Sequence, residues 1–379
     1  MLKQAKRIFA FITVLTIGIV FGACGGDNGG DDGPINLGVL LPITGAQATF
    51  GFDMERAIIL AAEEINAAGG VLGREFNVLP VADDGCDPMM AALAATVITS
   101  SEAHFVVGGY CSGATISALQ EFYDNDLIMV IGASNSTAIT ALGLNLHFML
   151  NSPGTHQIDK LVDVIHAVGA SDVAVIHQGD AFSQNLSDIS DRILPAAGIN
   201  IVTTEVMEFG VPDVGAIVTA VMHAGADLVF WAGYYADGGN MIRQLRAGGF
   251  TGHIVTADGA TSIELIEAAG PEGEGVLALS PPAAEFSPGG AAFIAAYEAR
   301  WGTSPGAFDP LAYTSVILLA QAIEEAGTIE TEAVRNALQN IDFTGLTGRV
   351  LFTPDRELRY SNFIVLEIRD GAFIHRDDI

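Results

Sequence analysis

Short apolar runs alternate with segments of helical periodicity along most of the chain. Apolar runs of strand length predict buried strands, and apolar residues that recur every three or four positions predict helices. In the first part of the chain the predicted strands are 35–41, 76–82, 105–108 and 127–131. The predicted helices between them are 53–68, 89–101 and 113–123. This alternation is typical of a parallel sheet with helices on both faces.

The same alternation starts again after Gly154. There the first predicted helix is 156–168, and the predicted strands are 173–176, 200–205, 228–231 and 253–256. A third stretch returns to helices at 290–301 and 312–326, and ends with strands at 350–352 and 362–367. We therefore expect an α/β protein with two doubly wound lobes, between which the chain crosses more than once.

The N-terminus has the layout of a secretory signal. Three basic residues precede an apolar run at 8–21, which is shorter than the roughly 20 residues that span a membrane. Small residues and then Cys24 follow, as at the cleavage site of bacterial lipoproteins, which this segment resembles. Phe21 departs from the Leu, Val or Ile that is usual there. We expect residues 1–23 to be a lipoprotein signal peptide and Cys24 to be acylated; the alternative is an ordinary signal peptide with an incidental cysteine.

A polar linker follows the predicted lipid site. Residues 25–33 consist only of glycine, aspartate and asparagine, so they cannot bury apolar surface. We expect 24–34 to be a flexible tether. No later stretch is apolar for long enough to form a transmembrane helix. The protein should therefore lie on the periplasmic or extracellular face of the cell envelope, held to the membrane by lipid.

The chain is strongly acidic. It carries 45 acidic and 16 basic residues, a formal net charge of −29. Three of the basic residues lie in the predicted signal peptide, which leaves 13 against 45, or −32, in the mature chain. Such a surface repels nucleic acid and anionic lipid, so both are poor partners. Hydrophobic residues make up 50% of the sequence, which excludes general disorder, and the length fits two domains.

The sequence shows no arrangement typical of catalysis or metal binding. Its eight histidines lack zinc-site spacing, and it has no nucleophile elbow, P-loop or dinucleotide fingerprint. The acidic stretch at 83–87 lacks the spacing of an EF-hand. We therefore expect no metal site, no cofactor and no enzymatic activity.

Several short strings are informative when their order is considered together. They are Pro42-Ile43-Thr44-Gly45, Phe50-Gly51, residues 62–70, Asp83-Asp84 close to Cys86-Asp87-Pro88, Cys111-Ser112, Gly233-Tyr234-Tyr235 and Asp258-Gly259. From about residue 35 to the C-terminus, the chain resembles the periplasmic substrate-binding proteins of branched-chain amino acid ABC transporters, the Leu/Ile/Val-binding type. The resemblance implies two Rossmann-like, doubly wound lobes joined by three hinge strands, the type 1 periplasmic binding protein fold.

The resemblance also implies how the chain is divided and what it does. The first lobe should comprise 35–153 and 283–350, and the second 154–282 and 351–379. A Cys86–Cys111 disulfide is implied, and in an exported protein such a bond persists. The lobes should close around a free amino acid, which the protein, a monomer, delivers to the permease subunits of an ABC transporter.

Ser112 is the first candidate ligand contact. It lies where the predicted strand 105–108 gives way to a helix, outside the carboxyl end of a parallel strand, where open α/β sheets bind ligands. The N–H groups of a helix N-terminus suit a carboxylate, and the hydroxyl adds a donor. The alternative is that Ser112 only caps the helix.

A second candidate loop follows the predicted strand 127–131. The resemblance implies that Ala133 and Asn135 supply a backbone carbonyl and a polar side chain to the ligand. A threonine is usual where Asn135 stands, and Ser134 takes that role if the alignment shifts by one residue.

Tyr234 and Asp258 each follow a predicted strand of the second lobe, so both should face the cleft. The resemblance implies that a tyrosine and a glutamate hold the ligand ammonium, and Asp258 is one methylene shorter than that glutamate. A buried carboxylate needs a cationic partner, which the ammonium supplies. The alternative for Asp258 is an exposed loop acid.

Phe50 and Phe182 stand where the family often has tyrosines that line the pocket. They are either pocket walls or ordinary core phenylalanines. We expect a receptor for an amino acid, most simply an aliphatic or branched-chain one. The alternatives are the same fold binding an amide, urea or an aromatic carboxylate, and a sensory ligand receptor.

Overall fold

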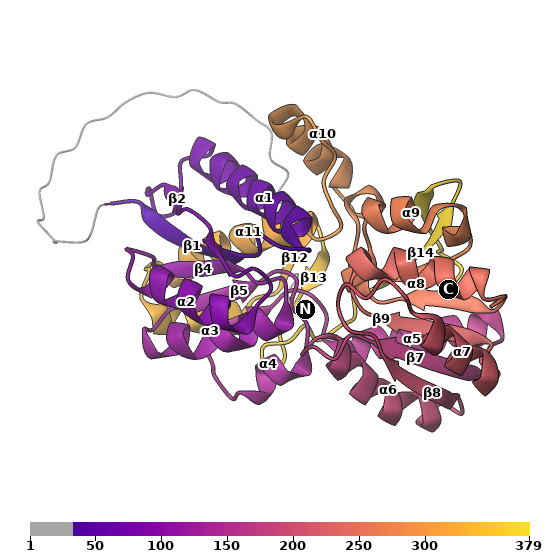
Figure 1. Cartoon of the computed structure of the whole chain (residues 1–379). Helices are drawn as coiled ribbons and strands as arrows, with labels where there is room; N and C mark the ends of the chain where they lie inside the picture. Colours follow the sequence, from indigo (N-terminus) through magenta and orange to yellow (C-terminus); the bar gives the residue numbers. More distant parts are fainter. Residues whose placement is uncertain (1–32) are drawn as a thin grey trace, which may run out of the picture. The chain divides into compact units, whose positions relative to one another are not determined.

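Two β-sheets organise the part of the chain that the structure, a computed structural model, describes, which is residues 33–379 (Figure 1). Residues 34–379 form one compact unit. The predicted signal peptide, Cys24 and most of the predicted tether lie outside the described residues. Within the described residues, no helix has both the length and the apolar character needed to cross a membrane.

The first sheet has the strand order β2-β1-β4-β5-β6, and β3 also pairs with β1. All its pairs are parallel. Its strands are β1 (Ile35–Leu41), β2 (Phe76–Val78), β3 (Ala82–Asp83), β4 (Phe105–Gly108), β5 (Ile128–Ile131) and β6 (His147–Met149). The helices in this part are α1 (Ala48–Ala67), α2 (Pro88–Thr99), α3 (Ser112–Asp124) and α4 (Thr137–Ala141). Every residue of β1, β4 and β5 is buried, as expected for strands covered on both faces.

Two local predictions in this region need correction. The single strand predicted at 76–82 is wrong, because β2 ends before Pro80, which lacks the N–H that a ladder needs, and pairing resumes at β3. The helix predicted from 53 begins at Ala48 instead. Gly51 permits this early start, because a Cβ at that position would overlap the carbonyl oxygen of Pro42.

The second sheet has the order β15-β14-β11-β10-β9-β7-β8. Its strands are β7 (Asp172–His177), β8 (Asn200–Val206), β9 (Leu228–Ala232), β10 (His253–Thr256), β11 (Leu277–Ser280), β14 (Ile364–Arg369) and β15 (Ala372–His375). Its helices are α5 (Gly154–Val168), α6 (Ser183–Ala196), α7 (Gly215–Ala224), α8 (Tyr235–Ala247), η1 (Asp258–Ala260), α9 (Ile263–Ala269) and η2 (Gly270–Gly273). The strands from β7 to β11 pair in parallel, whereas β14 and β15 pair antiparallel at one edge, so this sheet is mixed.

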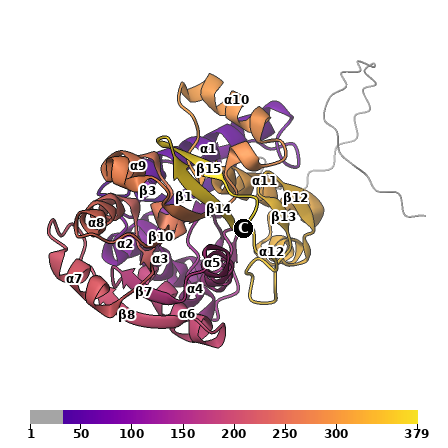
Figure 2. The ribbon, with the colours of Figure 1, turned by 90° about the vertical axis from the view of Figure 1, so that its right-hand side faces the viewer.

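The chain then returns to the first sheet before it ends in the second. The returning elements are η3 (Ala284–Phe286), α10 (Gly290–Trp301), α11 (Asp309–Ala326), α12 (Thr331–Asn340), β12 (Phe343–Gly345) and β13 (Gly348–Val350). Helix α11 packs against α1, β4 and β5. Figure 2 shows α11, α12, β12 and β13 grouped together. The late strand predicted at 350–352 is thus largely wrong, because β13 ends at Val350.

The path between the sheets confirms that the chain crosses more than once. It crosses after β6, after β11 and after β13. Ser152 in the first crossing donates from Oγ to Oδ1 of Asn362 in the third at 2.7 Å, and accepts from the Asn362 N–H at 3.0 Å. We call the two sheets with their packed helices the first and second lobes; the exact lobe boundaries given above stay a prediction.

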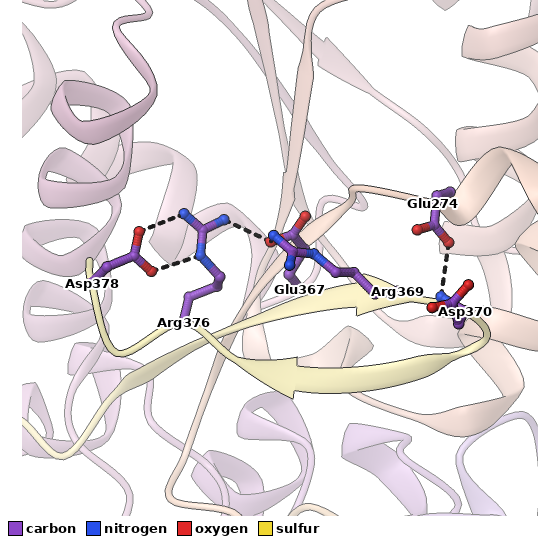
Figure 3. Close-up of polar contacts among 6 residues, drawn as sticks. All are labelled: Glu274, Glu367, Arg369, Asp370, Arg376 and Asp378. Carbon is purple, nitrogen blue, oxygen red and sulfur yellow. Dashed lines mark hydrogen bonds and ion pairs between the residues drawn. The ribbon is translucent and has the colours of Figure 1, made fainter.

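Ion pairs within the C-terminal hairpin join β14 to the residues that follow β15 (Figure 3). Glu367 on β14 accepts from Arg376 at 2.6 Å and from Arg369 at 2.8 Å. Burial raises the pKa of Glu367, but these two arginines outweigh it and the net shift is downward. Arg376 also binds Asp378 at 2.7 Å, which lowers the pKa of Asp378 to about 2.

The predicted disulfide is confirmed. Cys86 lies just after β3, and Cys111 directly precedes α3; their sulfurs are bonded and their Cα atoms are 5.3 Å apart. The bond therefore joins the loop after β3 to the N-terminus of the helix that begins with Ser112.

Two adjacent acids beside this disulfide have different surroundings. Asp83 accepts from the N–H of Ile43, the hydroxyl of Thr44 and the N–H of Gly85. Burial raises the pKa of Asp83, but these hydrogen bonds together lower it below its usual value. Asp84 is fully buried, accepts one hydrogen bond, from the Cys86 N–H, and its Oδ2 has no partner among the described residues. Burial and the charge of Asp83 raise the pKa of Asp84 to about 7, although the hydrogen bond from the Cys86 N–H opposes the shift.

The Asp84→Asn variant should therefore be more stable than the wild type at pH 8, by about 1–3 kcal/mol. A carboxyl whose pKa is raised on folding makes the folded state bind more protons than the unfolded state. Stability is then lost as the pH rises from about 4 to about 7. The asparagine has no charge to bury, so the variant keeps its stability as the pH rises. The difference in stability between the variant and the wild type should therefore shrink as the pH falls towards 4. Urea unfolding at several pH values measures it.

The Asp83→Asn variant is the matched control. It should be less stable than the wild type at pH 8 by about 1–2 kcal/mol, because the negative charge that strengthens the bonds from Ile43 and Gly85 is lost and an amide nitrogen in place of Oδ2 cannot accept from the Thr44 hydroxyl. An Asp84→Asn variant no more stable than the wild type at any pH would contradict the interpretation of Asp84.

Candidate ligand-binding site

The carboxyl ends of strands from both lobes surround one small cavity. The residues that line it follow β4 and β5 in the first lobe and β7, β9 and β10 in the second, or precede α11. They are Tyr110, Ala133, Asn135, Phe182, Tyr234, Asp258, Gly259 and Phe308. The cavity is small. The centre of a water molecule can move through about 10 Å³ of it, so it holds about one water. Five of the eight predicted ligand residues therefore line a single site, at the edge where open α/β sheets bind ligands.

Asp258 lies at the centre of the polar contacts of this site. It begins η1, directly after β10, and is 2% exposed, so it is not an exposed loop acid. Its Oδ2 accepts from Nδ2 of Asn135 at 3.0 Å and from Nδ2 of Asn151 at 2.8 Å. Its Oδ1 accepts from Nε2 of Gln157 and from the N–H of Gly259, both at 3.0 Å. All four donors are uncharged.

The charge of Asp258 has no counter-charge nearby. No ion pair involves this residue among the ion pairs of residues 33–379. Burial raises the pKa of Asp258 to about 6, although the hydrogen bonds from Asn151, Gln157 and Gly259 oppose the shift. Burying an ionised carboxylate without a cation is costly, so this carboxylate would gain from a positively charged group.

Tyr234 belongs to the second-lobe wall of the cavity. Its hydroxyl donates to Oδ2 of Asp180 at 2.9 Å, and its backbone N–H donates to Oε1 of Gln178 at 2.8 Å. Its ring lies 5.2 Å from that of Phe182. Burial, together with the charge of Asp180, raises its pKa well above the usual value, so the phenol stays protonated. Because the Tyr234 hydroxyl donates its proton to Asp180, its oxygen is left to accept hydrogen bonds from other groups.

Ser112 lies beside the cavity but does not line it. It is the first residue of α3, whose N-cap is Cys111, so its predicted alternative role as the N-cap is wrong. Its Oγ accepts from the N–H of Ser136 at 3.3 Å, which leaves its own proton free to donate. The neighbouring Ser134 does not line the cavity either, and shares a hydrogen bond of 2.7 Å with the hydroxyl of Thr115.

The aromatic residues form two layers around the cavity. Tyr110, Phe182, Tyr234 and Phe308 line it. Phe50 lies behind this layer, stacked on Tyr110 at 4.9 Å and edge-on to Phe308 at 5.3 Å. Phe50 thus supports the wall, whereas Phe182 is part of the lining.

Residues 34–372 match the periplasmic binding protein family. The chain belongs to that family. Among the relatives of this periplasmic binding protein, the leucine-, isoleucine-, valine-, threonine- and alanine-binding protein of Pseudomonas aeruginosa is 29% identical over 345 residues, which cover 89% of this chain and 91% of the relative.

Solved structures agree with the fold of this periplasmic binding protein. A leucine binding protein, LivK, from Thermotoga maritima superposes with a TM-score of 0.83 at 25% identity, covering 91% of this chain and 100% of its own. A solute binding protein from Rhodopseudomonas palustris in complex with benzoate has a TM-score of 0.82 over 90% of this chain and 95% of its own, but at 18% identity it shows the fold alone. The chain is thus a periplasmic binding protein of the branched-chain amino acid ABC transporter type, and the predicted fold class is confirmed.

Sequence reasoning missed several residues of this periplasmic binding protein's site. Tyr110 and Gly259 directly adjoin the predicted Cys111-Ser112 and Asp258 positions, so the same strand-end argument could have found them. Phe308 comes from the third stretch of the chain, where no local pattern marks it. Asn151 and Gln157 lie in the first crossing and in α5, and only their contacts with Asp258 distinguish them from other buried amides.

Other hydrogen bonds join the two lobes of the periplasmic binding protein outside the cavity. The hydroxyl of Tyr235 on α8 donates to the carbonyl of Ala46 before α1 at 2.7 Å. Asn185 on α6 accepts from the Thr137 N–H at 3.1 Å and donates to its hydroxyl at 2.8 Å. Among the described residues, His, Cys, Asp and Glu side chains nowhere gather in the groups of three or more that hold a metal ion.

Proposed function

We propose that the protein is an extracytoplasmic, lipid-anchored receptor that binds an aliphatic amino acid between its lobes and delivers it to an ABC permease. The single observation that carries the ligand class is Asp258. Its carboxylate is buried, lies on the cavity wall and receives only uncharged donors. The ammonium of an amino acid supplies the missing positive charge, and Tyr234 adds an acceptor oxygen.

The other end of the amino acid is assigned to the first lobe. The N-terminus of α3 presents unpaired N–H groups, and the hydroxyl proton of Ser112 is free to donate. A ligand carboxylate suits these donors. Ala133 also lines the cavity, and we assign its carbonyl to the ligand backbone.

The side chain of the ligand meets the aromatic lining. Tyr110, Phe182 and Phe308 provide apolar surface, and no arginine or lysine lines the cavity. A second carboxylate on the ligand would have no partner there, which argues against acidic amino acids. An aliphatic side chain gains most from such a wall.

Ligand that touches both lobes shifts the hinge equilibrium towards the closed arrangement. The lobes meet through three crossings, and Ser112 and Asp258 lie on opposite lobes. A ligand bound to only one of these residues would shift nothing, because it would not distinguish the open state from the closed one.

A neutral amide is the second candidate ligand. Asp258 accepts hydrogen bonds from amide N–H groups of the protein itself, so an amide N–H of a ligand is also a suitable donor. An aromatic carboxylate, in contrast, offers no donor and would bring a second negative charge to the site.

Calorimetric titration with leucine and two analogues tests the proposal. 4-Methylpentanoate lacks only the amine, and leucinamide lacks only the carboxylate. Residues 34–379 form one compact unit and suffice for the measurement. We expect leucine to bind one-to-one and each analogue to bind at least about 100-fold more weakly, since each leaves one buried polar group unpaired. Equal binding of leucine and 4-methylpentanoate would remove the ammonium role of Asp258.

A further inference from the structure

Two hydrogen bonds between residues of the cavity lining cross from lobe to lobe. The hydroxyl of Tyr110 donates to the carbonyl of Gly259 at 3.5 Å, and the shorter bond reaches Asp258. Asn135, which follows β5 in the first lobe, donates from Nδ2 to Oδ2 of Asp258, which follows β10 in the second, at 3.0 Å. The two side chains are 1% and 2% exposed. Both also line the cavity. We call Asn135 and Asp258 the cross-cleft pair.

The carboxylate of Asp258 has no acceptor capacity left. Each of its oxygens accepts two hydrogen bonds, and a carboxylate offers about four lone-pair positions in all. A ligand N–H can therefore reach Asp258 only by taking the place of one of the four donors.

Three of those donors are fixed in place. The Gly259 N–H belongs to the residue that follows Asp258 in the chain. Asn151 donates at the same time to the carbonyl of Ala133 at 2.8 Å. Gln157 is fully buried on α5, and neither amide lines the cavity. Asn135 is the one of the four donors whose side chain belongs to a residue of the cavity lining, so it is the donor that a ligand in the cavity can displace.

We propose that Asn135 is a built-in competitor of the ligand amine: it holds the lobes together through Asp258 until an amine takes its place. This inference rests on the proposed function, in which the amine binds Asp258. The exchange favours the ligand, because a neutral amide leaves the buried carboxylate and an ammonium replaces it. The cost of releasing Asn135 still lowers the measured affinity.

The Asn135→Ala variant separates this role from an ordinary ligand contact. Without the competing amide, leucine should bind about tenfold more tightly, the effect of removing one hydrogen bond to a charged group. The unliganded variant should also be more open, with a larger radius of gyration in small-angle X-ray scattering. Binding of 4-methylpentanoate should not tighten, because that ligand never displaces Asn135.

Asn185→Ala is the matched control. It removes two lobe-to-lobe hydrogen bonds with Thr137 that lie outside the cavity and do not compete with a ligand. It should also open the unliganded protein, but leucine binding should not tighten. Asn135→Ser, which keeps a small polar side chain, replaces the alanine variant if that variant folds poorly.

The outcomes are distinguishable from a failure of the proposed function. If no amino acid binds the wild type, the proposed ligand class is wrong, and scattering of the unliganded Asn135→Ala variant still decides whether the pair holds the lobes. Unchanged scattering would overturn the inference. Leucine binding that is unchanged or weaker in the variant would overturn the competition and leave Asn135 as an ordinary ligand contact.

Discussion

Replacing Asp258 with alanine is expected to weaken the binding of an amine-bearing ligand by at least about 100-fold. Removing one member of a buried charge pair typically costs about 3–5 kcal/mol, and about 1.4 kcal/mol corresponds to a factor of ten. Asp258 lies on the cavity wall and has no other counter-charge among the described ion pairs, so the ligand ammonium has no substitute partner there. Calorimetric titration of the variant with leucine measures the loss.

A low pH should weaken leucine binding to the wild type, as the Asp258→Ala substitution does. The pKa of Asp258 is raised to about 6, so the carboxylate is charged at neutral pH and becomes protonated below about pH 6. Leucine binding should therefore weaken as the pH falls through 6. The binding of 4-methylpentanoate, which has no amine, should not weaken over the same range. This difference separates the titration of Asp258 from general acid destabilisation.

Asp180→Asn is the control for the Asp258 variant. Asp180 accepts from Tyr234 but does not line the cavity, so its neutralisation should change leucine affinity by less than about tenfold. Thermal unfolding of both variants excludes misfolding as the cause. Wild-type affinity for leucine in Asp258→Ala would show that this carboxylate does not bind the amine.

Removal of the disulfide should cost about 3–4 kcal/mol of unfolding free energy. Cys86 and Cys111 are 25 residues apart, and closing a loop of that length in the unfolded chain is worth about this much in the loop-entropy account. The Cys86→Ser/Cys111→Ser double variant should therefore unfold at a lower urea concentration, and reductant should produce the same shift in the wild type.

Cys24→Ser is the natural comparison for this double variant. Its cysteine lies outside the described residues and outside the compact unit at 34–379, so its replacement should leave the urea midpoint unchanged. Identical midpoints for the wild type and the double variant would show that the bond does not stabilise the fold.

The fold was largely predictable because its central strands are buried on both faces. Uninterrupted apolar runs such as 105–108 can be recognised from the sequence, and β4 has those bounds. Prediction failed at short or marginal elements. The hairpin β14–β15 lies at a sheet edge, and β15 has only four residues, none of them fully buried, so its short apolar run does not stand out in the sequence.

The site was predictable only where residues follow strands. The resemblance implied Asn135, Tyr234 and Asp258, and all three follow predicted strands, whose carboxyl ends meet at one edge of a parallel sheet. Phe308 precedes a helix that packs back on the first lobe from more than 150 residues away, and no local pattern encodes that return. The pairing of Asn135 with Asp258 likewise depends on how the lobes meet, which periodicity does not describe.

The path of the chain also sets the order in which the protein can assemble as it is synthesised. The first sheet is synthesised by residue 149, but α11, which covers β4 and β5, begins only at Asp309. The second sheet is likewise incomplete until β14 is synthesised. Strand β14 is the antiparallel partner of β11, and it ends ten residues before the C-terminus. Domains usually fold one after another as a chain emerges. Here neither lobe can be completed until most of the chain has been synthesised, so apolar sheet surface stays uncovered until α11 and then β14 are available.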